Sequence, residues 1–158
     1  MYRFIMSLLF IFILPFDVVG DRLNLFGMNA SIKFAGAYFV NDGILTIDRV
    51  VPGNLEVYGC YINSVNNDEL MVFIRNIEGL DLVVMNDFYN KIEVRFGLFL
   101  YDGVVWRKLY FQTKKRKESE YFYVYVDDVV YRAPGYFFDK VRAYIDNIYK
   151  SSACNRSN

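Results

Sequence analysis

Apolar residues fall into short runs that are separated by turn-forming residues along most of the chain. In the clearest run, Ile92, Val94, Phe96, Leu98 and Leu100 occupy every second position. Side chains in a strand point alternately to opposite faces, so this pattern predicts a half-buried strand with these five residues on one face. Other runs that predict strands lie at residues 31–40, 44–50, 55–62, 70–76, 80–85, 104–112, 121–126 and 129–132.

Turn signals separate these runs. They are "NDG" at 41–43, "PGN" at 52–54, "EG" at 78–79 and "YDG" at 101–103. Asn, Asp and Gly tolerate the positive φ that tight connections require, so neighbouring strands should form hairpins. Eight or nine short strands at this spacing predict a mainly β fold, an antiparallel sandwich or an open barrel over residues 30–132.

One stretch near the end of the chain has helical periodicity. Phe138, Val141, Ile145 and Ile148 recur at the spacing of one helix face within residues 136–150. This apolar stripe predicts one C-terminal amphipathic helix that packs on the sheet.

The composition favours the same fold. Aromatic residues are 19% of the 158, with 15 Phe and 14 Tyr, and they suit a pleated, half-buried surface. Trp106 has the same strand parity as Val104, and we expect it to be largely buried. The predicted core is Phe34, Ile92, Val94, Phe96, Leu98, Trp106, Phe138, Val141, Ile145 and Ile148.

The N-terminal residues have the pattern of a secretory signal peptide. Arg3 precedes an apolar stretch at residues 4–16, and Val18 and Gly20 provide a cleavage site before Asp21. A membrane anchor or a buried helix is the alternative, but about 13 apolar residues are fewer than the roughly 20 that a bilayer needs. We expect a signal peptide at 1–20, a secreted single β-rich domain at 21–158, and no transmembrane segment after signal removal.

Charge and residue usage argue against several classes of function. The chain has 18 basic and 18 acidic residues, so no net charge drives it onto nucleic acid. It contains no His, which excludes Ser-His-Asp and Cys-His catalysis and His-dependent metal sites. We expect no catalytic residues, no metal site and no cofactor. Carboxylates that could support hydrolysis fall in predicted turns: Asp42, Asp68, Asp87, Asp102, Asp127 and Asp128.

Two cysteines and two sequons bear on a secreted protein. Cys60 and Cys154 are expected to pair in an oxidising compartment. In the alternative, Cys60 is a small buried side chain and Cys154 a thiol that is free or pairs between molecules. Asn29 in "NAS" and Asn155 in "NRS" are candidate glycosylation sites, which would make the product a glycoprotein.

A run of four basic residues separates two of the predicted strands: Lys114, Lys115, Arg116 and Lys117. Four adjacent cations belong in solvent, so we expect the exposed loop of a hairpin. Such a loop either only discourages edge pairing or also makes a contact with a polyanion such as a glycosaminoglycan.

Three segments together resemble a known family. They are "AYFVNDGILTIDRVVPGNLEVYGC", "ELMVFIRNIEGLDLVVMNDFYN" and "FGLFLYDGVVWRKL". Their order, with "IDRVVPG" and "DGVVW", resembles the FAINT domain of secreted piroplasm-parasite proteins over about residues 37–110, although Tyr58 stands where many members have tryptophan. The resemblance implies a β-rich protein exported to the parasite surface or the host-cell environment, without enzymatic activity.

The sequence therefore predicts a secreted, non-enzymatic protein for host–parasite interaction that binds a host protein or glycan. One alternative is a secreted viral immunomodulator that captures a cytokine or chemokine. A second alternative is a secreted carboxylate-dependent hydrolase. An exposed aromatic patch would favour binding, whereas a deep pocket with converging carboxylates would favour the hydrolase.

Overall fold

The computed structural model describes residues 21–22, 25, 31–41, 46, 48–63, 67–86, 92–112, 120–152 and 154. The predicted signal peptide at 1–20 lies outside these residues. So do the sequon residues Asn29 and Asn155 and the whole basic run at 114–117.

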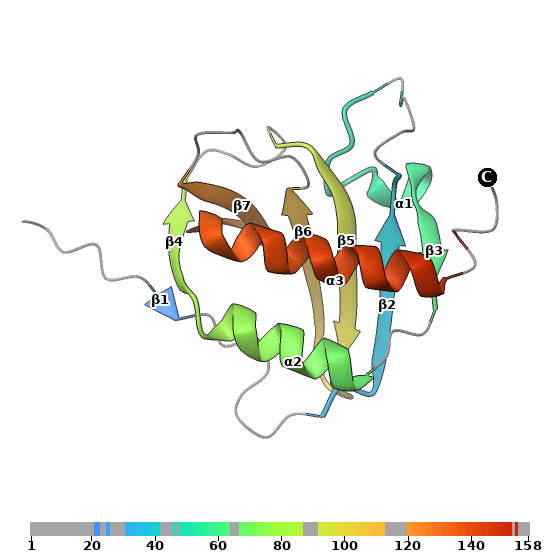
Figure 1. Ribbon diagram of the computed structural model, residues 1–158, viewed down its shortest axis with the longest axis horizontal. Helices are drawn as coiled ribbons and strands as arrows, with labels where there is room; N and C mark the ends of the chain where they lie inside the picture. The colour runs from blue at the N-terminus through green and yellow to red at the C-terminus, as the bar shows by residue number, and fades with distance from the viewer. Residues whose placement is uncertain are drawn as a thin grey trace, which may run out of the picture.

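One open antiparallel sheet forms the centre of the described chain, which confirms the mainly β prediction (Figure 1). The strand order is β1-β4-β8-β7-β6-β5-β2-β3, so the sheet does not close into a barrel. It is also a single sheet, with helices where a sandwich would have a second sheet. The strands are β1 (Asp21–Arg22), β2 (Phe34–Phe39), β3 (Cys60–Ile62), β4 (Asp81–Met85), β5 (Val94–Tyr101), β6 (Trp106–Gln112), β7 (Tyr121–Val126) and β8 (Val129–Pro134).

Two helices, α2 (Asn67–Glu78) and α3 (Phe138–Ser151), cover one face of the sheet (Figure 1). The predicted C-terminal helix is confirmed as α3, which follows a short 3₁₀ turn, η1 (Gly135–Phe137). Its residues Val141, Ile145 and Ile148 are buried, and Phe138 is partly buried against the same core.

The strand predicted at residues 70–76 is wrong, because this stretch belongs to α2. Leu70, Phe73, Ile74 and Ile77 are all buried and recur at i, i+3, i+4 and i+7, the spacing of one helix face. Asp68, expected in a turn, lies in the first turn of this helix, where a negative charge favours the helix dipole.

The two strands predicted at 44–50 and 55–62 are also largely wrong. Leu55–Tyr58 forms a short helix, α1, and only Cys60–Ile62 pairs as a strand. Residues 46 and 48–50, which the structure describes in the earlier stretch, are not in a strand. The Asn54 side chain accepts a hydrogen bond from Val51 N at 2.7 Å, so the predicted "PGN" turn leads into a helix.

The larger core lies between the sheet and the two helices. It combines the inward faces of α2 and α3 with alternate residues of the central strands. Phe73 of α2 stacks on Tyr144 of α3 with ring centroids 4.0 Å apart, so the helices contact each other as well as the sheet. The strand residues of this core include Phe96, Leu98, Phe111, Phe122 and Val124.

A smaller core lies on the opposite face of the sheet, under α1. Leu55 of α1 packs directly over Gly97 of β5, where an added Cβ would lie 2.7 Å from a Leu55 methyl carbon. Glycine is therefore needed at position 97 for this close approach. Val50, Phe99, Tyr110 and other residues complete the cluster.

A β-bulge in β5 overturns the prediction that its alternate residues share one face. The register with β6 shifts between Val94 and Phe96, so Ile92 and Val94 join the smaller core while Phe96 and Leu98 join the larger one. At the bulge, the buried Arg95 guanidinium pairs with Glu93 at 2.8 Å and donates to the Asn41 carbonyl oxygen at 2.9 Å.

Candidate functional site

The turn between β5 and β6 is fixed by its own side chains. Asp102 Oδ1 accepts hydrogen bonds from the backbone N–H groups of Val104 and Val105, both at 2.8 Å. Gly103 has a φ of +106°, which only glycine adopts readily, and its carbonyl oxygen accepts from the Tyr101 hydroxyl at 2.7 Å. The hydrogen bonds from Val105 and then Val104 hold the pKa of Asp102 below its ordinary value.

Trp106 follows this turn, and the prediction that it is largely buried is wrong. The side chain is 52% exposed. Pairing between β6 and β7 begins only at Leu109 with Val126, so Trp106 extends past the end of β7. Val104, whose parity the prediction used, lies in the turn before β6 and is itself 84% exposed.

Two aromatic neighbours hold the indole in place. Tyr101, its cross-strand partner on β5, stacks on it with centroids 4.9 Å apart and planes at 22°. Phe34 meets it edge-on at 5.6 Å, which accounts for Phe34 being half-buried here and not in the core as predicted. Val104 and Val105 beside them are 84% and 40% exposed, so an apolar patch lies at this corner of the sheet.

The turn between β7 and β8 lies on the other side of Trp106. Asp127, with a φ of 52°, accepts a hydrogen bond from Lys108 N at 2.9 Å and pairs with Arg107 Nη1 at 2.8 Å. Its own N–H donates to the Lys108 carbonyl oxygen at 2.7 Å. These bonds fasten the turn to the part of β6 that β7 does not reach.

A cavity of about 470 Å³ opens between this turn, β6 and the segment that leads into α1. Its walls come from segments far apart in the chain, so only the folded sheet brings them together. The lining residues are Pro52, Gly53, Glu56, Val57, Trp106, Lys108, Tyr110, Asp127 and Asp128.

The charges around this cavity are mainly negative. Three carboxylates and one ammonium group line it. The ammonium group of Lys108 lies 5.4 Å from the ring centroid of Phe99 on β5, on the side away from the β7–β8 turn. Glu56 and Asp128 are both exposed at the mouth. The arrangement suits a ligand with an apolar or planar part.

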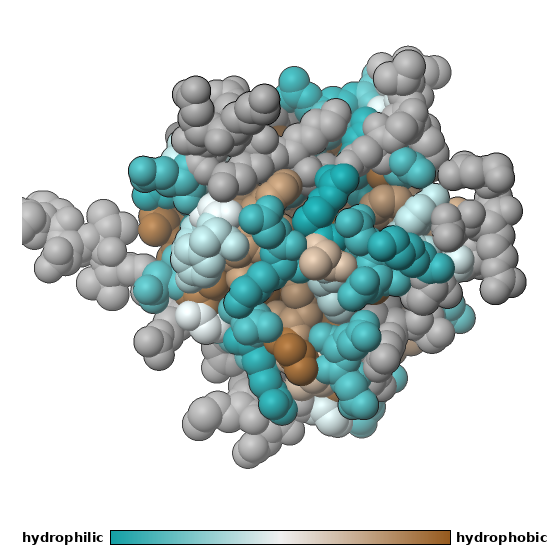
Figure 2. Space-filling model, in the orientation of Figure 1, coloured by the Kyte–Doolittle hydropathy of each residue, from teal (hydrophilic) through white to brown (hydrophobic). Residues whose placement is uncertain are grey.

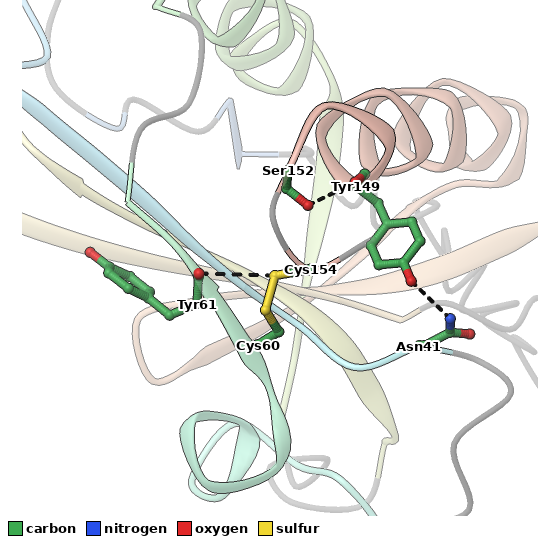
Figure 3. The surroundings of a disulfide bond; sticks show 6 residues. All are labelled: Asn41, Cys60, Tyr61, Tyr149, Ser152 and Cys154. Atoms are coloured by element: carbon green, nitrogen blue, oxygen red, sulfur yellow. Dashed lines mark hydrogen bonds between the residues drawn. A yellow bond between two sulfur atoms is a disulfide. The ribbon is translucent and has the colours of Figure 1, made fainter. Parts of the chain in front are cut away.

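The cysteine pair lies at the edge of the sheet that β3 forms. Cys60 and Cys154 form a disulfide bond with Cα atoms 6.0 Å apart (Figure 3). The bond joins β3 to the chain just beyond α3, and the Cys154 sulfur lies 3.9 Å from the Tyr61 carbonyl oxygen. The Asn41 side chain also donates to the Tyr149 hydroxyl at 3.2 Å, so the end of α3 is held at two places.

A second, more open hollow of about 570 Å³ lies between α2 and α3. Figure 2 shows this helix-covered face as mostly hydrophilic, with hydrophobic surface at its middle. Val72 there is 61% exposed. The Tyr144 hydroxyl is buried without a hydrogen-bond partner among the described residues, and burial raises the pKa of Tyr144.

Within the described ranges, no three His, Cys, Asp or Glu side chains gather closely enough to hold a metal ion. Each helix in that part of the chain is too short or too polar to cross a bilayer. Searches against protein-family models, curated proteins and solved structures find no match to this chain.

The sequence analysis predicted Trp106 as a core residue and Asp127 as a turn residue, and it missed the cavity that they share with Glu56. One local signal was present. In "DGVVWRK", two valines and a tryptophan follow a tight turn and precede two basic residues, which puts apolar side chains at the tip of a hairpin. No local sequence pattern indicated that Pro52, Gly53 and Glu56 line the same cavity, because their position depends on how α1 packs across the sheet.

Proposed function

We propose that this protein is a secreted, non-enzymatic binding module that engages host macromolecules through the surface around Trp106. The observation that carries the proposal is the position of the indole. The single tryptophan of the chain is half-exposed, held by Tyr101 and Phe34, and forms one wall of a cavity. Tryptophan at a rigid, exposed position is characteristic of the residues that dominate binding energies at interfaces.

Secretion is supported by two independent features. The pattern at residues 1–20 is that of a signal peptide. The Cys60–Cys154 bond is of the kind that forms and persists in oxidising compartments. The resemblance to the FAINT domain adds a parasite surface or the host-cell environment as the place of action.

The cavity also contains carboxylates, so a hydrolase has to be weighed against binding. Paired-carboxylate hydrolysis needs one carboxyl group in an apolar, buried setting where it can act as an acid. Glu56 and Asp128 are exposed instead. Both oxygens of Asp127 accept hydrogen bonds, from Arg107 and from the backbone of Lys108. These features favour binding over catalysis.

Affinity capture with matched variants tests the proposal. The protein, produced by secretion from eukaryotic cells, is immobilised and exposed to host serum and host-cell membrane extracts. We expect wild type to retain a defined set of host proteins or glycoconjugates, and Trp106→Ala to lose them. Tyr136→Ala is the control, because Tyr136 is 69% exposed and lies near the opposite end of the sheet.

Each variant is first shown to keep the wild-type circular dichroism spectrum. Equal capture by wild type and Trp106→Ala, or no specific capture by wild type, would contradict the proposed function. Captured cytokines or chemokines that depend on Trp106 would favour the viral immunomodulator over the parasite surface protein.

A further inference from the structure

We infer that the cavity beside Trp106 binds a neutral sugar of a host glycan, a hexopyranose with equatorial hydroxyl groups that stacks on the indole. This inference rests on the proposed function and adds the chemistry of the ligand. It follows from which face of the indole is open, from the mixture of polar and apolar groups in the cavity and from how firmly its walls are held.

The open face of the indole looks into the cavity. Tyr101 stacks on the side of Trp106 that faces β5. On the other side, β7 does not extend as far as Trp106, and the cavity occupies the space up to the turn at Asp127 and Asp128. One ring face is therefore covered by the protein, and the other is presented to a ligand.

A ring with an apolar face suits the open side of the indole. In a pyranose whose hydroxyl groups are equatorial, the C–H bonds of the ring carbons are axial and point to its two faces. Such a face stacks on an indole through dispersion and through the removal of apolar surface from water. The cavity volume of about 470 Å³ lies within the range of pockets that hold small molecules.

The other walls of the cavity combine apolar surface with hydrogen-bonding groups, and a sugar presents both kinds of surface. Pro52 and Val57 contribute apolar surface, and Val57 is 78% exposed. Glu56 contributes carboxylate oxygens and Lys108 an ammonium group. A sugar hydroxyl both donates and accepts hydrogen bonds, so it pairs with either group.

Most of the charges beside the indole already have partners in the protein. Asp127 pairs with Arg107 at 2.8 Å, and Asp128 also interacts within the protein. The Lys108 ammonium group lies 5.4 Å from the ring centroid of Phe99. An engaged carboxylate still accepts further hydrogen bonds, because its oxygens offer about four lone-pair sites. The cavity therefore suits a neutral polar ligand, which needs donors and acceptors but no uncompensated charge.

The Glu56 carboxylate favours a neutral sugar over an anionic one. It lines the cavity and belongs to an exposed residue of α1. A uronic acid or a sialic acid would bring a second carboxylate close to it, and like charges repel. Neutral hexoses and N-acetylhexosamines carry no such group.

The walls of the cavity are held before a ligand arrives. Asp102 fixes the β5–β6 turn through two backbone hydrogen bonds, and Asp127 fixes the β7–β8 turn to β6. Leu55 anchors α1 over Gly97. A site that is already ordered loses little conformational entropy on binding.

The single tryptophan makes the test direct, because its fluorescence reports on one wall of this cavity. The full secreted protein is titrated with methyl β-glucoside, with the matched anionic methyl β-glucuronide and with sorbitol, an open-chain polyol without a ring face. We expect saturable quenching or a shift of emission with the glucoside, at a Kd of about 1 mM. The glucuronide should bind about three- to five-fold more weakly, and sorbitol should give no saturable response.

Variants of Glu56 separate hydrogen bonding from charge. Glu56→Ala should weaken binding of the glucoside about three- to five-fold, whereas Glu56→Gln keeps an acceptor and should stay within about two-fold of wild type. The control Asp139→Ala removes an exposed carboxylate from α3, on the helix-covered side of the sheet, and should leave binding unchanged. Raising the salt from about 50 mM to about 500 mM should leave the affinity for the glucoside unaffected.

Removal of glycans connects this cavity to the captured host molecules. Host serum and membrane extracts are treated with glycosidases before affinity capture, and mock-treated extracts are the control. We expect the capture that depends on Trp106 to be lost after glycosidase treatment and to persist in the mock-treated extracts.

The inference is overturned if the glucoside gives no saturable response, if sorbitol matches it, or if capture survives glycosidase treatment. A Trp106 response to the acetylated and amidated peptide Gly-Arg-Gly, with none to the glucoside, also overturns it and assigns the cavity to protein segments. These results leave the proposed binding function intact if capture still depends on Trp106. Capture that is independent of Trp106 would instead end the proposed function, whatever the sugars do.

Discussion

The two faces of the sheet are covered in different ways. On one face, α2 and α3 lie across the strands and close a continuous core. On the other face, α1 and the segment before it cover the centre, where Leu55 is fully buried, while Trp106 at the corner is half-exposed. One face of the sheet thus carries the larger core, and the other carries the surface around Trp106 through which we propose that the protein binds.

The exposure of two aromatic strand residues differs between these faces. Phe96 and Trp106 both lie in well-paired strands, and both are large aromatic side chains. Phe96 is fully buried because helices cover its face of the sheet, whereas Trp106 contacts Tyr101 and Phe34 and stays 52% exposed. Whether an aromatic strand residue is buried or exposed therefore depends on which segments, far away in the sequence, pack over its face of the sheet.

The largest expected contrast is in stability. Phe96→Ala should lower the free energy of unfolding by about 4 kcal/mol, because it leaves a cavity in the closed core. Trp106→Ala should lower it by only about 1 kcal/mol, mainly through the lost stacking on Tyr101. Urea denaturation monitored by circular dichroism measures both. Equal costs for the two substitutions would contradict the difference between the faces.

The disulfide should be the next largest contribution, and it acts on the helix-covered side. Replacing Cys60 and Cys154 together by Ser should cost about 3 kcal/mol, since the bond constrains a loop of 94 residues in the unfolded chain. Differential scanning calorimetry of the double variant, and of wild type with and without reductant, checks this. A melting temperature that does not change in either comparison would show that the bond adds nothing.

A smaller effect is expected at the turn that borders the open cavity. Asp127→Ala should cost about 2 kcal/mol, because it removes the bonds to Arg107 and Lys108 and places a Cβ-bearing residue without a polar side chain at positive φ. Asp127→Asn should cost about half as much, since asparagine tolerates this backbone and keeps an acceptor. Thermal unfolding measures both, and the reverse order would contradict the role given to the carboxylate.

The smallest effect concerns pH on the helix-covered face. Burial, and secondly Glu69, raises the pKa of Tyr144 above its ordinary value of 10.0. Its contribution to stability is therefore complete below pH 10 and is lost as the pH rises through the folded-state pKa. Stability should fall above about pH 10, and less steeply in Tyr144→Phe. An unchanged slope in that variant would assign the alkaline loss to other tyrosines.

Part of this fold can be predicted from the sequence because the signals are local. The stripe of Val141, Ile145 and Ile148 identified α3, and turn residues located the hairpin at Asp102. The same spacing was present in Leu70, Phe73, Ile74 and Ile77 of α2. There the β-branched and aromatic composition favoured a strand, and the helical periodicity that decided the structure was given too little weight.

The other features of the fold and of the candidate site depend on contacts between segments that are far apart in the sequence, so no local pattern predicts them. A bulge beside Arg95 exchanges the faces of Val94 and Phe96 in one strand, although the alternation on either side looks continuous. The candidate site needs Glu56 from α1 and Asp127 from a turn about 70 residues later. Their proximity follows from the packing of Leu55 over Gly97 and from the length of β7, which are properties of the assembled sheet.

The disulfide bond between Cys60 and Cys154 would keep the protein in one piece after a single proteolytic cut between these two residues. A trypsin-like enzyme that cuts once within the basic run at 114–117 leaves two pieces that remain covalently joined, because Cys60 precedes the cut and Cys154 follows it. The pieces are also joined by the pairing of β6 with β7, one strand from each. A clipped molecule would thus migrate as one species until it is reduced, and would still carry Trp106 and Asp127 side by side.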